Sequence, residues 1–260
     1  MAANNWDKCC AITLDFEGGN DDDPHDPGGR TSRGITQREY DVWRRSHAGL
    51  PSDVWKAPQG TIVSIYRDSY WNACAGDIWA TGCDLCVYDE TVNSGPGRAL
   101  SGARAVFGTP TANWATLAAA STALKDRTGW IKRYQAKRLS FLEGLRTWSY
   151  FGTGWGRRVA GIEALALKMS AASQGQAPAS VLQGEAKTAK AKGLASGGAS
   201  TASAGATGAH ISTVADWHGA LGIVAGAVLV LVGVALLLYL LHVSRVQSLR
   251  VHALNAEAAR

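Results

Sequence analysis

Apolar side chains recur at helical spacing between residues 8 and 169. In the stretch 8–17, Ile12 and Phe16 lie four residues apart, on one face of a helix that has Glu17 at its end. The same reading predicts helices over residues 36–47, 59–73, 84–94, 98–107, 113–124 and 128–146, the last of them basic. The pattern therefore predicts a mainly helical globular region.

Residues 18–36 interrupt this helical pattern. They are rich in Gly and Asp, which favour turns, and they predict a loop and a small β-hairpin with residues 34–36 in a strand. Thr36 can then cap the next helix, with Glu39 three residues later as the partner in a capping box. The predicted fold class is mainly α, with one small hairpin.

A long apolar run follows near the C-terminus. Residues 219–243 contain no Asp, Glu, Lys or Arg, and the run is long enough to cross a bilayer. The alternative is a buried core helix, although few soluble helices are apolar on every face. We predict a transmembrane helix over residues 218–243 and a basic tail over 244–260.

The stretch between the globular region and this run has a different composition. Residues 170–217 consist mainly of Ala, Gly, Ser and Lys, which cannot bury a core of their own, so they predict a flexible linker. Within the globular region we separate a catalytic domain, residues 8–95, from a helical region, residues 96–169.

The sequence leaves the orientation in the membrane open. Arg245, Arg250 and Arg260 follow the apolar run, which places the tail in the cytoplasm and the globular region outside. No signal peptide is recognisable at the N-terminus. In the opposite orientation, the globular region waits on the cytoplasmic face until a separate pore-forming protein opens the membrane.

The net charge and the cysteine content limit which partners, disulfides and metal sites the chain can have. The net charge of +5 favours acidic polymers, among them nucleic acid and anionic cell-wall strands. The five cysteines are an odd number, which excludes a complete disulfide framework. Cys83 and Cys86 have the spacing of metal ligands, but no second such pair exists, so we expect reduced thiols, no metal and no cofactor.

Two carboxylates in the Gly-rich stretch are candidates for catalysis. Glu17 and Asp26 are separated by turn-forming residues, and cleavage of a glycosidic bond needs two acidic groups flanking one sugar ring. We expect Glu17 to act as the general acid in an apolar neighbourhood, and Asp26 to hold or activate a water molecule. Glu17 can also be a solvated helix end, and Asp26 can simply start a turn.

Four segments in order resemble glycoside hydrolase family 108, the muramidase family of phage endolysins and related bacterial secretion-associated enzymes. They are EGGNDDDPHDPGGRTSRGIT from Glu17, IYRDSYWN from Ile65, YDETVNSGPGRA from Tyr88 and FLEGLRTWSYFGTGWGRRV from Phe141. The resemblance implies a lysozyme-like fold. It also implies hydrolysis of the β-1,4 bond between N-acetylmuramic acid and N-acetylglucosamine, with Glu17 as the acid.

Two features depart from the family pattern. Ser32 stands where the family often has Asn, so either Thr31 or Ser32 can supply the hydroxyl that holds the water. The stretch from Phe107 to Ala120 largely lacks the signature of the family's peptidoglycan-binding region, so residues 96–169 either bind the wall or only complete the core.

Several further side chains are candidates for a substrate cleft. Aromatic rings stack on sugars and amides bond to N-acetyl groups, which points to Tyr70, Trp71, Tyr88 and Asn93. For the tryptophans, packing in the core is the competing role.

The leading hypothesis is a membrane-anchored muramidase of the inner membrane, acting on periplasmic peptidoglycan in phage-type lysis or wall remodelling. We expect it to bind peptidoglycan glycan strands, not nucleic acid, and to contact the bilayer through residues 219–243. A non-catalytic wall-binding anchor and a pore-forming lysis protein are the alternatives.

Overall fold

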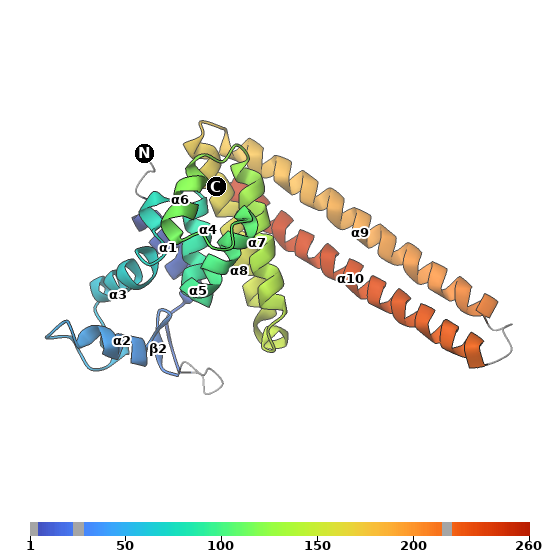
Figure 1. The fold of residues 1–260 in the computed structure, drawn as a ribbon, viewed down its shortest axis with the longest axis horizontal. Coiled ribbons are helices and arrows are strands. Elements are labelled where there is room, and N and C mark those ends of the chain that lie inside the picture. Colours follow the sequence, from blue (N-terminus) through green and yellow to red (C-terminus); the bar gives the residue numbers. More distant parts are fainter. Residues whose placement is uncertain (1–4, 23–28, 215–219) are drawn as a thin grey trace. The chain divides into compact units, whose positions relative to one another are not determined.

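A computed structural model describes the backbone of residues 5–22, 29–214 and 220–260, and their side chains apart from residues 197–227 and 229. The chain divides into two compact units, Met1–Gly175 and Gln176–Arg260. The described elements are helices with a single three-stranded antiparallel sheet, which confirms the predicted fold class (Figure 1).

The first unit begins with a helix and the small sheet. Helix α1 spans Trp6–Glu17, and the strands are β1 (Asn20–Asp21), β2 (Thr31–Ser32) and β3 (Ile35–Thr36). In the sheet Asp21 pairs with Thr31, and Thr31 pairs with Thr36. The predicted hairpin is therefore present, in the order β1-β2-β3.

The remaining elements of the first unit are helical and mostly match the predicted stretches. They are α2 (Gln37–Arg44), η1 (Val54–Lys56), α3 (Gln59–Ile65), the π-helical η2 (Tyr66–Trp71), η3 (Gly76–Ile78), α4 (Cys83–Ser94), α5 (Pro96–Phe107), α6 (Trp114–Thr122), α7 (Arg127–Glu143) and α8 (Trp148–Ser173). The Thr36 side chain caps α2, accepting a 3.1 Å hydrogen bond from the Glu39 N–H, as predicted.

Helix α4 is the centre of the first unit. Every residue from Cys83 to Thr91 is buried, and α4 contacts α1, α5, α7 and α8 (Figure 1). Aromatic rings fill the space around it, with Trp6, Trp71 and Tyr88 in mutual edge-on contact. Polar side chains on α4 are thereby held in a dry interior, where they need partners.

The sequence pattern does not predict helix α8. Glycines such as Gly152 and Gly161 lower helix propensity and obscure the periodicity. In the structure they make room for rings: a Cβ at Gly152 would lie 2.6 Å from the Trp148 indole, and one at Gly161 would lie 3.1 Å from Phe16. Tertiary packing against α7 overrides the weak propensity.

The second unit consists of two long helices, α9 (Pro178–Val214) and α10 (Ala220–Ala258), which lie side by side and antiparallel (Figure 1). The composition of residues 170–217 predicts coil, whereas the structure describes helical backbone over most of that stretch. Alanine has the highest helix propensity of any residue, so a segment without a core of its own can still be helical. Residues 215–219 lie outside the described part.

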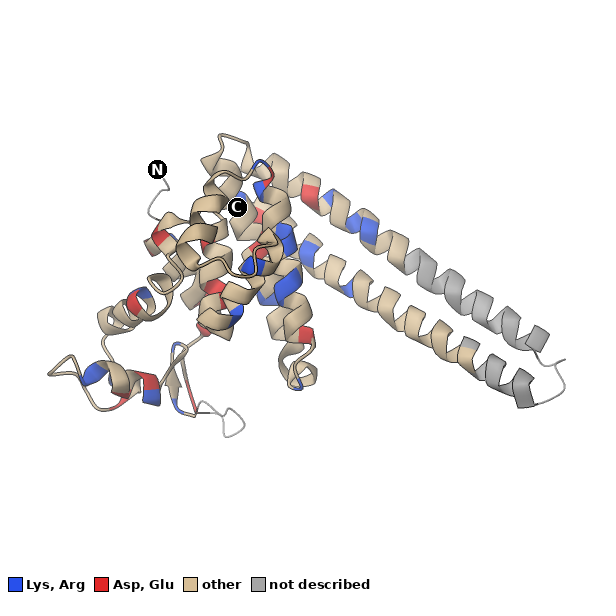
Figure 2. Ribbon diagram, viewed as in Figure 1, with Lys and Arg blue, Asp and Glu red and all other residues tan. Residues whose placement is uncertain are grey.

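Helix α10 contains a candidate membrane span. The segment Val230–Ala258 is long and apolar enough to cross a bilayer, and Leu231 and Tyr239 are more than half exposed. In Figure 2 its described turns show few charged residues before the basic C-terminal part, where Arg245 and Arg250 lie. The helix continues through the predicted basic tail to Ala258.

Candidate active site

Two local features place Glu17 at the edge of the sheet. Helix α1 ends at Glu17 because Gly18, with φ of 71°, adopts a backbone conformation that leaves the helix. The two-residue turn between β2 and β3 has positive φ at both Arg33 and Gly34 (50° and 77°), as primed hairpin turns require. This turn packs on Glu17, since a Cβ at Gly34 would lie 2.5 Å from Glu17 Oε2.

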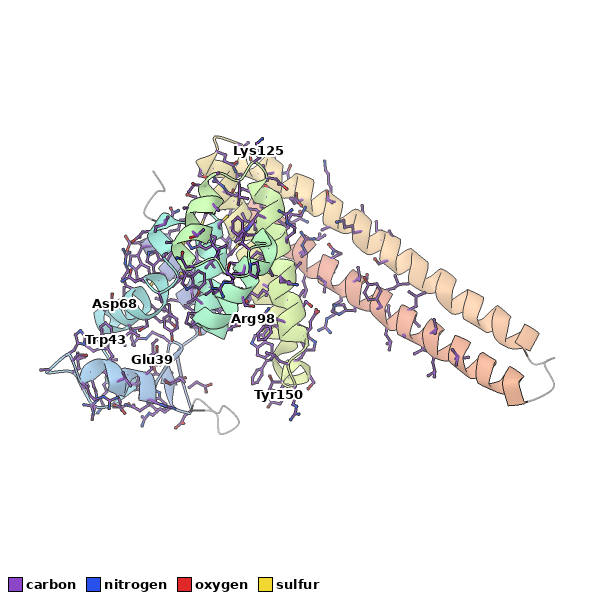
Figure 3. All side chains as sticks on the ribbon, in the orientation of Figure 1. Glu39, Trp43, Asp68, Arg98, Lys125 and Tyr150 are labelled. Atoms are coloured by element: carbon purple, nitrogen blue, oxygen red, sulfur yellow. The ribbon has the colours of Figure 1, made fainter. Side chains whose placement is uncertain are left out.

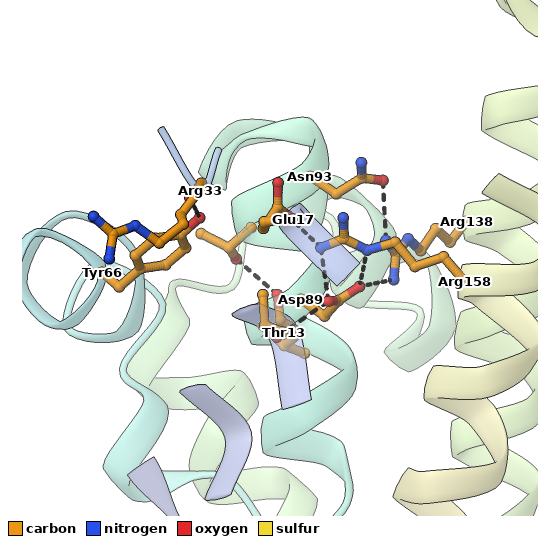
Figure 4. Close-up of polar contacts among 10 residues, drawn as sticks. Thr13, Glu17, Arg33, Tyr66, Asp89, Asn93, Arg138 and Arg158 are labelled. Carbon is orange, nitrogen blue, oxygen red and sulfur yellow. Dashed lines mark hydrogen bonds and ion pairs between the residues drawn. The ribbon is translucent and has the colours of Figure 1, made fainter. Parts of the chain in front are cut away.

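The carboxylate of Glu17 pairs with Arg158 of α8. Arg158 Nη2 donates to Glu17 Oε1 at 2.6 Å, and the Glu17 side chain is 15% exposed (Figure 4). The surroundings of Glu17 thus differ from the apolar neighbourhood expected from Ile12, Leu14 and Phe16. The Phe16 ring lies instead below the Arg158 guanidinium, at 5.6 Å.

Arg158 is held in turn by Asp89 of α4. Its Nε and Nη2 donate to the two Asp89 oxygens at 3.0 and 2.8 Å, and Asp89 also pairs with Arg138 Nη1 at 2.7 Å. Thr13 adds a hydroxyl donor at 3.1 Å. Burial raises the pKa of Asp89, but the guanidinium groups of Arg158 and Arg138 outweigh it and leave that pKa below its ordinary value.

The resulting chain of charges runs from the edge of the sheet into the core. With both carboxylates ionised, Glu17 and Asp89 balance Arg158 and Arg138, and Asn93 Oδ1 accepts from Arg138 Nη2 at 3.0 Å (Figure 4). Buried charges persist in proteins when they are paired in this way. Asp89 therefore offsets much of the positive charge that Arg158 would otherwise place beside Glu17.

Two tyrosines from η2 complete the surroundings of Glu17. Tyr66 donates its hydroxyl to the Arg33 carbonyl at 2.6 Å, which fastens the hairpin turn to η2. Burial raises the pKa of Tyr66 well above its ordinary value, and the nearby Glu17 carboxylate raises it further. Tyr66 is therefore a neutral hydrogen-bond donor throughout the physiological pH range.

Tyr70 lies beside Tyr66, with ring centroids 5.5 Å apart, and donates to Glu39 Oε1 at 2.7 Å. Glu39 is thus tied to η2 through its side chain and to the cap of α2 through its backbone N–H. Burial raises the pKa of Glu39, while the Tyr70 hydrogen bond partly lowers it.

Thr31 and Ser32, the two residues predicted to hold the water through a hydroxyl group, differ in how deeply they are buried. Ser32 is fully buried and its hydroxyl accepts from Arg33 Nε at 3.4 Å. Thr31 is only partly buried, and its hydroxyl makes one long contact of 3.4 Å to the Asp21 carbonyl. A water molecule at the surface can reach Thr31 but not Ser32.

Two of the predicted cleft aromatics lie in the core. Trp71 is 1% exposed and donates its indole N–H to Asp77, and Tyr88 is fully buried against Trp6 and Trp71. Neither ring presents a face to a sugar, because close packing favours these large apolar rings inside. The expectation that they line a cleft is corrected accordingly, whereas Tyr70 and Asn93 are partly exposed.

Asp26 lies outside the described residues, so its position relative to Glu17 is not part of the structure. All five cysteines are buried and unpaired with one another. The described residues contain no group of His, Cys, Asp or Glu side chains that could hold a metal ion.

Sequence reasoning missed Asp89, Arg138 and Arg158 as members of the site. Asp89 and Arg158 both lie within segments that resemble the family, but nothing in the sequence indicates that they pair with each other or with Glu17. Only the packing of α1, α4, α7 and α8 brings these side chains together (Figure 4).

Comparisons with known proteins identify a family and a similar structure. The sequence model of the family described as Glycosyl hydrolase 108 matches residues 10–95. The solved structure of Brucella abortus SagA is similar to this chain, with 33% sequence identity and a TM-score of 0.57 over 64% of this chain and 95% of that one. No curated protein matches the chain.

Proposed function

The chain belongs to glycosyl hydrolase family 108, and from this membership we propose that it is an N-acetylmuramidase with Glu17 as the general acid. Its substrate in this proposal is peptidoglycan, and the bond cut is the β-1,4 linkage between N-acetylmuramic acid and N-acetylglucosamine. Residues 8–95 form the catalytic domain. The observation that carries the proposal is the fixed position of Glu17, held between the hairpin turn and Arg158 with part of its side chain open to solvent.

Arg158 and Asp89 explain how Glu17 is held in place for this role. A guanidinium alone beside a carboxylate stabilises its charged form. Here the Arg158 charge is shared with Asp89, which holds two of its hydrogen bonds. Arg158 therefore holds Glu17 while it is itself held by Asp89, so the Glu17 carboxyl group is fixed relative to the core.

Asp26 and Thr31 take the other half of the reaction in this proposal. One carboxylate protonates the leaving oxygen while the second activates water or stabilises positive charge on the sugar. Thr31 rather than Ser32 holds that water, because Ser32 is fully buried. Tyr70 and Asn93 remain proposed substrate contacts.

The catalytic role of Glu17 is tested by Glu17→Gln in the full chain in detergent. We expect this variant to stop releasing reducing ends from purified peptidoglycan while its unfolding temperature stays close to that of the parent. Asp15→Asn is the matched control, because Asp15 is exposed on the same helix and the change is the same amide replacement. Activity retained in Glu17→Gln would remove the assignment.

The identity of the bond is tested on the products. Mass analysis of the released muropeptides should show the new reducing ends on N-acetylmuramic acid. Reducing ends on N-acetylglucosamine would replace the muramidase proposal with a glucosaminidase. Tight wall binding by the parent chain with no release of sugar would favour a non-catalytic anchor.

We also propose that α10 tethers the enzyme to the inner membrane as a single span, with the catalytic domain acting on the periplasmic wall. The apolar run over residues 219–243, which overlaps the candidate span of α10, and the arginines that follow this run support the placement. In a phage-type lysis setting, the opposite orientation would need a separate pore-forming protein. Protease added to intact spheroplasts should digest residues 8–169 if they face the periplasm, and should leave them intact if they face the cytoplasm.

A further inference from the structure

Exposed and half-buried aromatic side chains gather at the start of α8. Trp148, Tyr150, Phe151 and Trp155 contact one another, with ring centroids 6.2 Å apart for Trp148 and Trp155, 5.5 Å for Phe151 and Trp155, and 5.0 Å for Tyr150 and Phe151. Tyr150 is 71% exposed and Phe151 is 38% exposed. Figure 3 shows Tyr150 at this end of the helix. Rings of this size are usually buried, so their exposure here calls for an explanation.

Two of these rings, Phe151 and Trp155, lie on the same face of α8 as Arg158. Phe151, Trp155 and Arg158 are spaced four and three residues apart, which places them in one row along a helix. The row spans about 10 Å at 1.5 Å per residue. It therefore leads directly from the exposed rings to the guanidinium that holds Glu17.

Phe16 continues the row beyond Arg158. It precedes Glu17 on α1, is 38% exposed, and lies under the Arg158 guanidinium. Gly161, one turn further along α8, leaves room for its ring, since a Cβ there would lie 3.1 Å from Phe16. Aromatic rings thus lie on both sides of Arg158, at the start of α8 and at the residue beside the proposed acid.

We infer that this row, formed by Phe151, Trp155 and Phe16, together with the Tyr150 ring that contacts Phe151, is a stacking surface for the glycan strand on one side of the scissile bond. The inference rests on the proposed function and adds to it a subsite supplied by α8. Sugar rings have apolar faces that pack on aromatic rings, while their hydroxyls stay in water. The position of Phe16 and Arg158 beside Glu17 selects a glycan as the occupant, because a strand held at Glu17 must run along one of the surfaces next to it.

The first experiment measures binding without hydrolysis. Full-length Glu17→Gln protein in detergent is titrated with isolated peptidoglycan glycan strands, alone and combined with Trp155→Ala or Tyr150→Ala. We expect each added change to weaken the affinity, by about tenfold for Trp155→Ala, which corresponds to about 1.4 kcal/mol. Tyr150→Ala guards against misfolding as the cause, because Tyr150 is mostly exposed.

Two kinds of control distinguish stacking from general loss of apolar surface. Trp155→Phe and Tyr150→Phe keep a ring and should retain most of the affinity. Ile78→Ala removes an exposed apolar side chain from η3, outside the row, and should leave the affinity unchanged. Equal affinity in the alanine and phenylalanine variants would overturn the inference.

The second experiment uses the active enzyme. Trp155→Ala should raise KM for glycan strands and leave kcat close to that of the parent, since the ring lies away from the bond that is cut. Unchanged KM and affinity in the ring variants, with Glu17→Gln inactive, would overturn the subsite and leave the muramidase proposal standing. An active Glu17→Gln variant would instead remove the muramidase proposal, and the KM of Trp155→Ala would then decide whether the row binds glycan.

Discussion

Arg158 Nη2 lies 2.6 Å from Glu17 Oε1, although the two residues are 141 positions apart in the chain. The same nitrogen lies 2.8 Å from Asp89 Oδ1. One guanidinium thus fixes the end of α1 to the buried α4, and the proposed acid is positioned by the core of the first unit. The charges along this path are the source of most of the predictions below.

Arg158→Lys should lower kcat strongly and change the free energy of unfolding less. A lysine keeps the positive charge but cannot hold Glu17 and Asp89 with one planar fork. Because loss of alignment at a reacting group costs up to about a hundredfold in rate, we expect kcat to fall by about 10- to 100-fold. Arg157→Lys, the same change at an exposed neighbour, should leave kcat unchanged; equal kcat in both variants would contradict the positioning role of Arg158.

Asp89→Asn should destabilise the first unit strongly. The change removes the negative charge that Arg138 and Arg158 share in the interior, and breaking a buried pair from one side costs about 3–5 kcal/mol. Denaturant unfolding followed by tryptophan fluorescence measures this, since the tryptophans lie almost entirely in that unit. Asp15→Asn should change the free energy of unfolding by less than about 0.5 kcal/mol, and a similar value for Asp89→Asn would refute the prediction.

Gly34→Ala should abolish activity through the position of Glu17. The new Cβ would lie 2.5 Å from Glu17 Oε2, so the carboxylate or the turn has to move. Gly49→Ala provides the matched control, because Gly49 also has positive φ (84°) but a Cβ there meets no atom within 4 Å. Both variants should lose about 1–2 kcal/mol of stability from the backbone conformation, and only Gly34→Ala should lose the release of reducing ends.

Titration of the Asp84 carboxyl group should lower the free energy of unfolding as the pH rises from about 4 to 6. Burial raises its pKa from 3.8 to about 6, despite hydrogen bonds from Asn5, Gly82 and Leu85. Because the pKa of Asp84 is higher in the folded than in the unfolded state, Asp84 contributes fully to stability below its unfolded-state pKa. This contribution is lost as the pH rises through the folded-state pKa. Unfolding temperatures between pH 4 and 7 should show this slope in the parent, and a flatter one in Asp84→Asn.

Asp89 predicts the opposite slope at lower pH. Its pKa in the folded state lies below the ordinary value, so the stability that it contributes is present above about pH 4 and is lost as pH falls through the folded pKa. The pH range in which Asp84 titrates, about 4 to 6, does not overlap the range below about pH 4 in which Asp89 titrates, so the two effects can be measured separately. A parent whose unfolding temperature is constant from pH 2 to 4 would contradict this assignment.

Local rules in the sequence were enough for most helices and for the hairpin. Glu17 ends α1 because a glycine follows it, and Thr36 starts α2 because its hydroxyl can cap the helix. Such features depend on neighbours a few residues away, so a pattern of residue types reveals them. The same rules failed for α8, whose glycines are tolerated only because the rings of Trp148 and Phe16 occupy the space beside them.

Trp71 and Tyr88 show the limit of reasoning from residue type. An aromatic residue in a segment that resembles a hydrolase can face a sugar or fill the core, and the sequence does not distinguish these roles. Both rings are in the core, whereas the exposed rings of α8 were not singled out. Exposure depends on how helices cross, and this information is spread over the whole chain.

The sequence by itself determined the mainly helical fold class, the apolar C-terminal helix and the family, because propensity, turn chemistry and ordered motifs are local properties of the chain. Only the tertiary structure decided what surrounds Glu17. Asp89 and Arg158 come from helices far apart in the sequence, and an ion pair between them forms only where packing removes water and brings their charged groups within hydrogen-bonding distance.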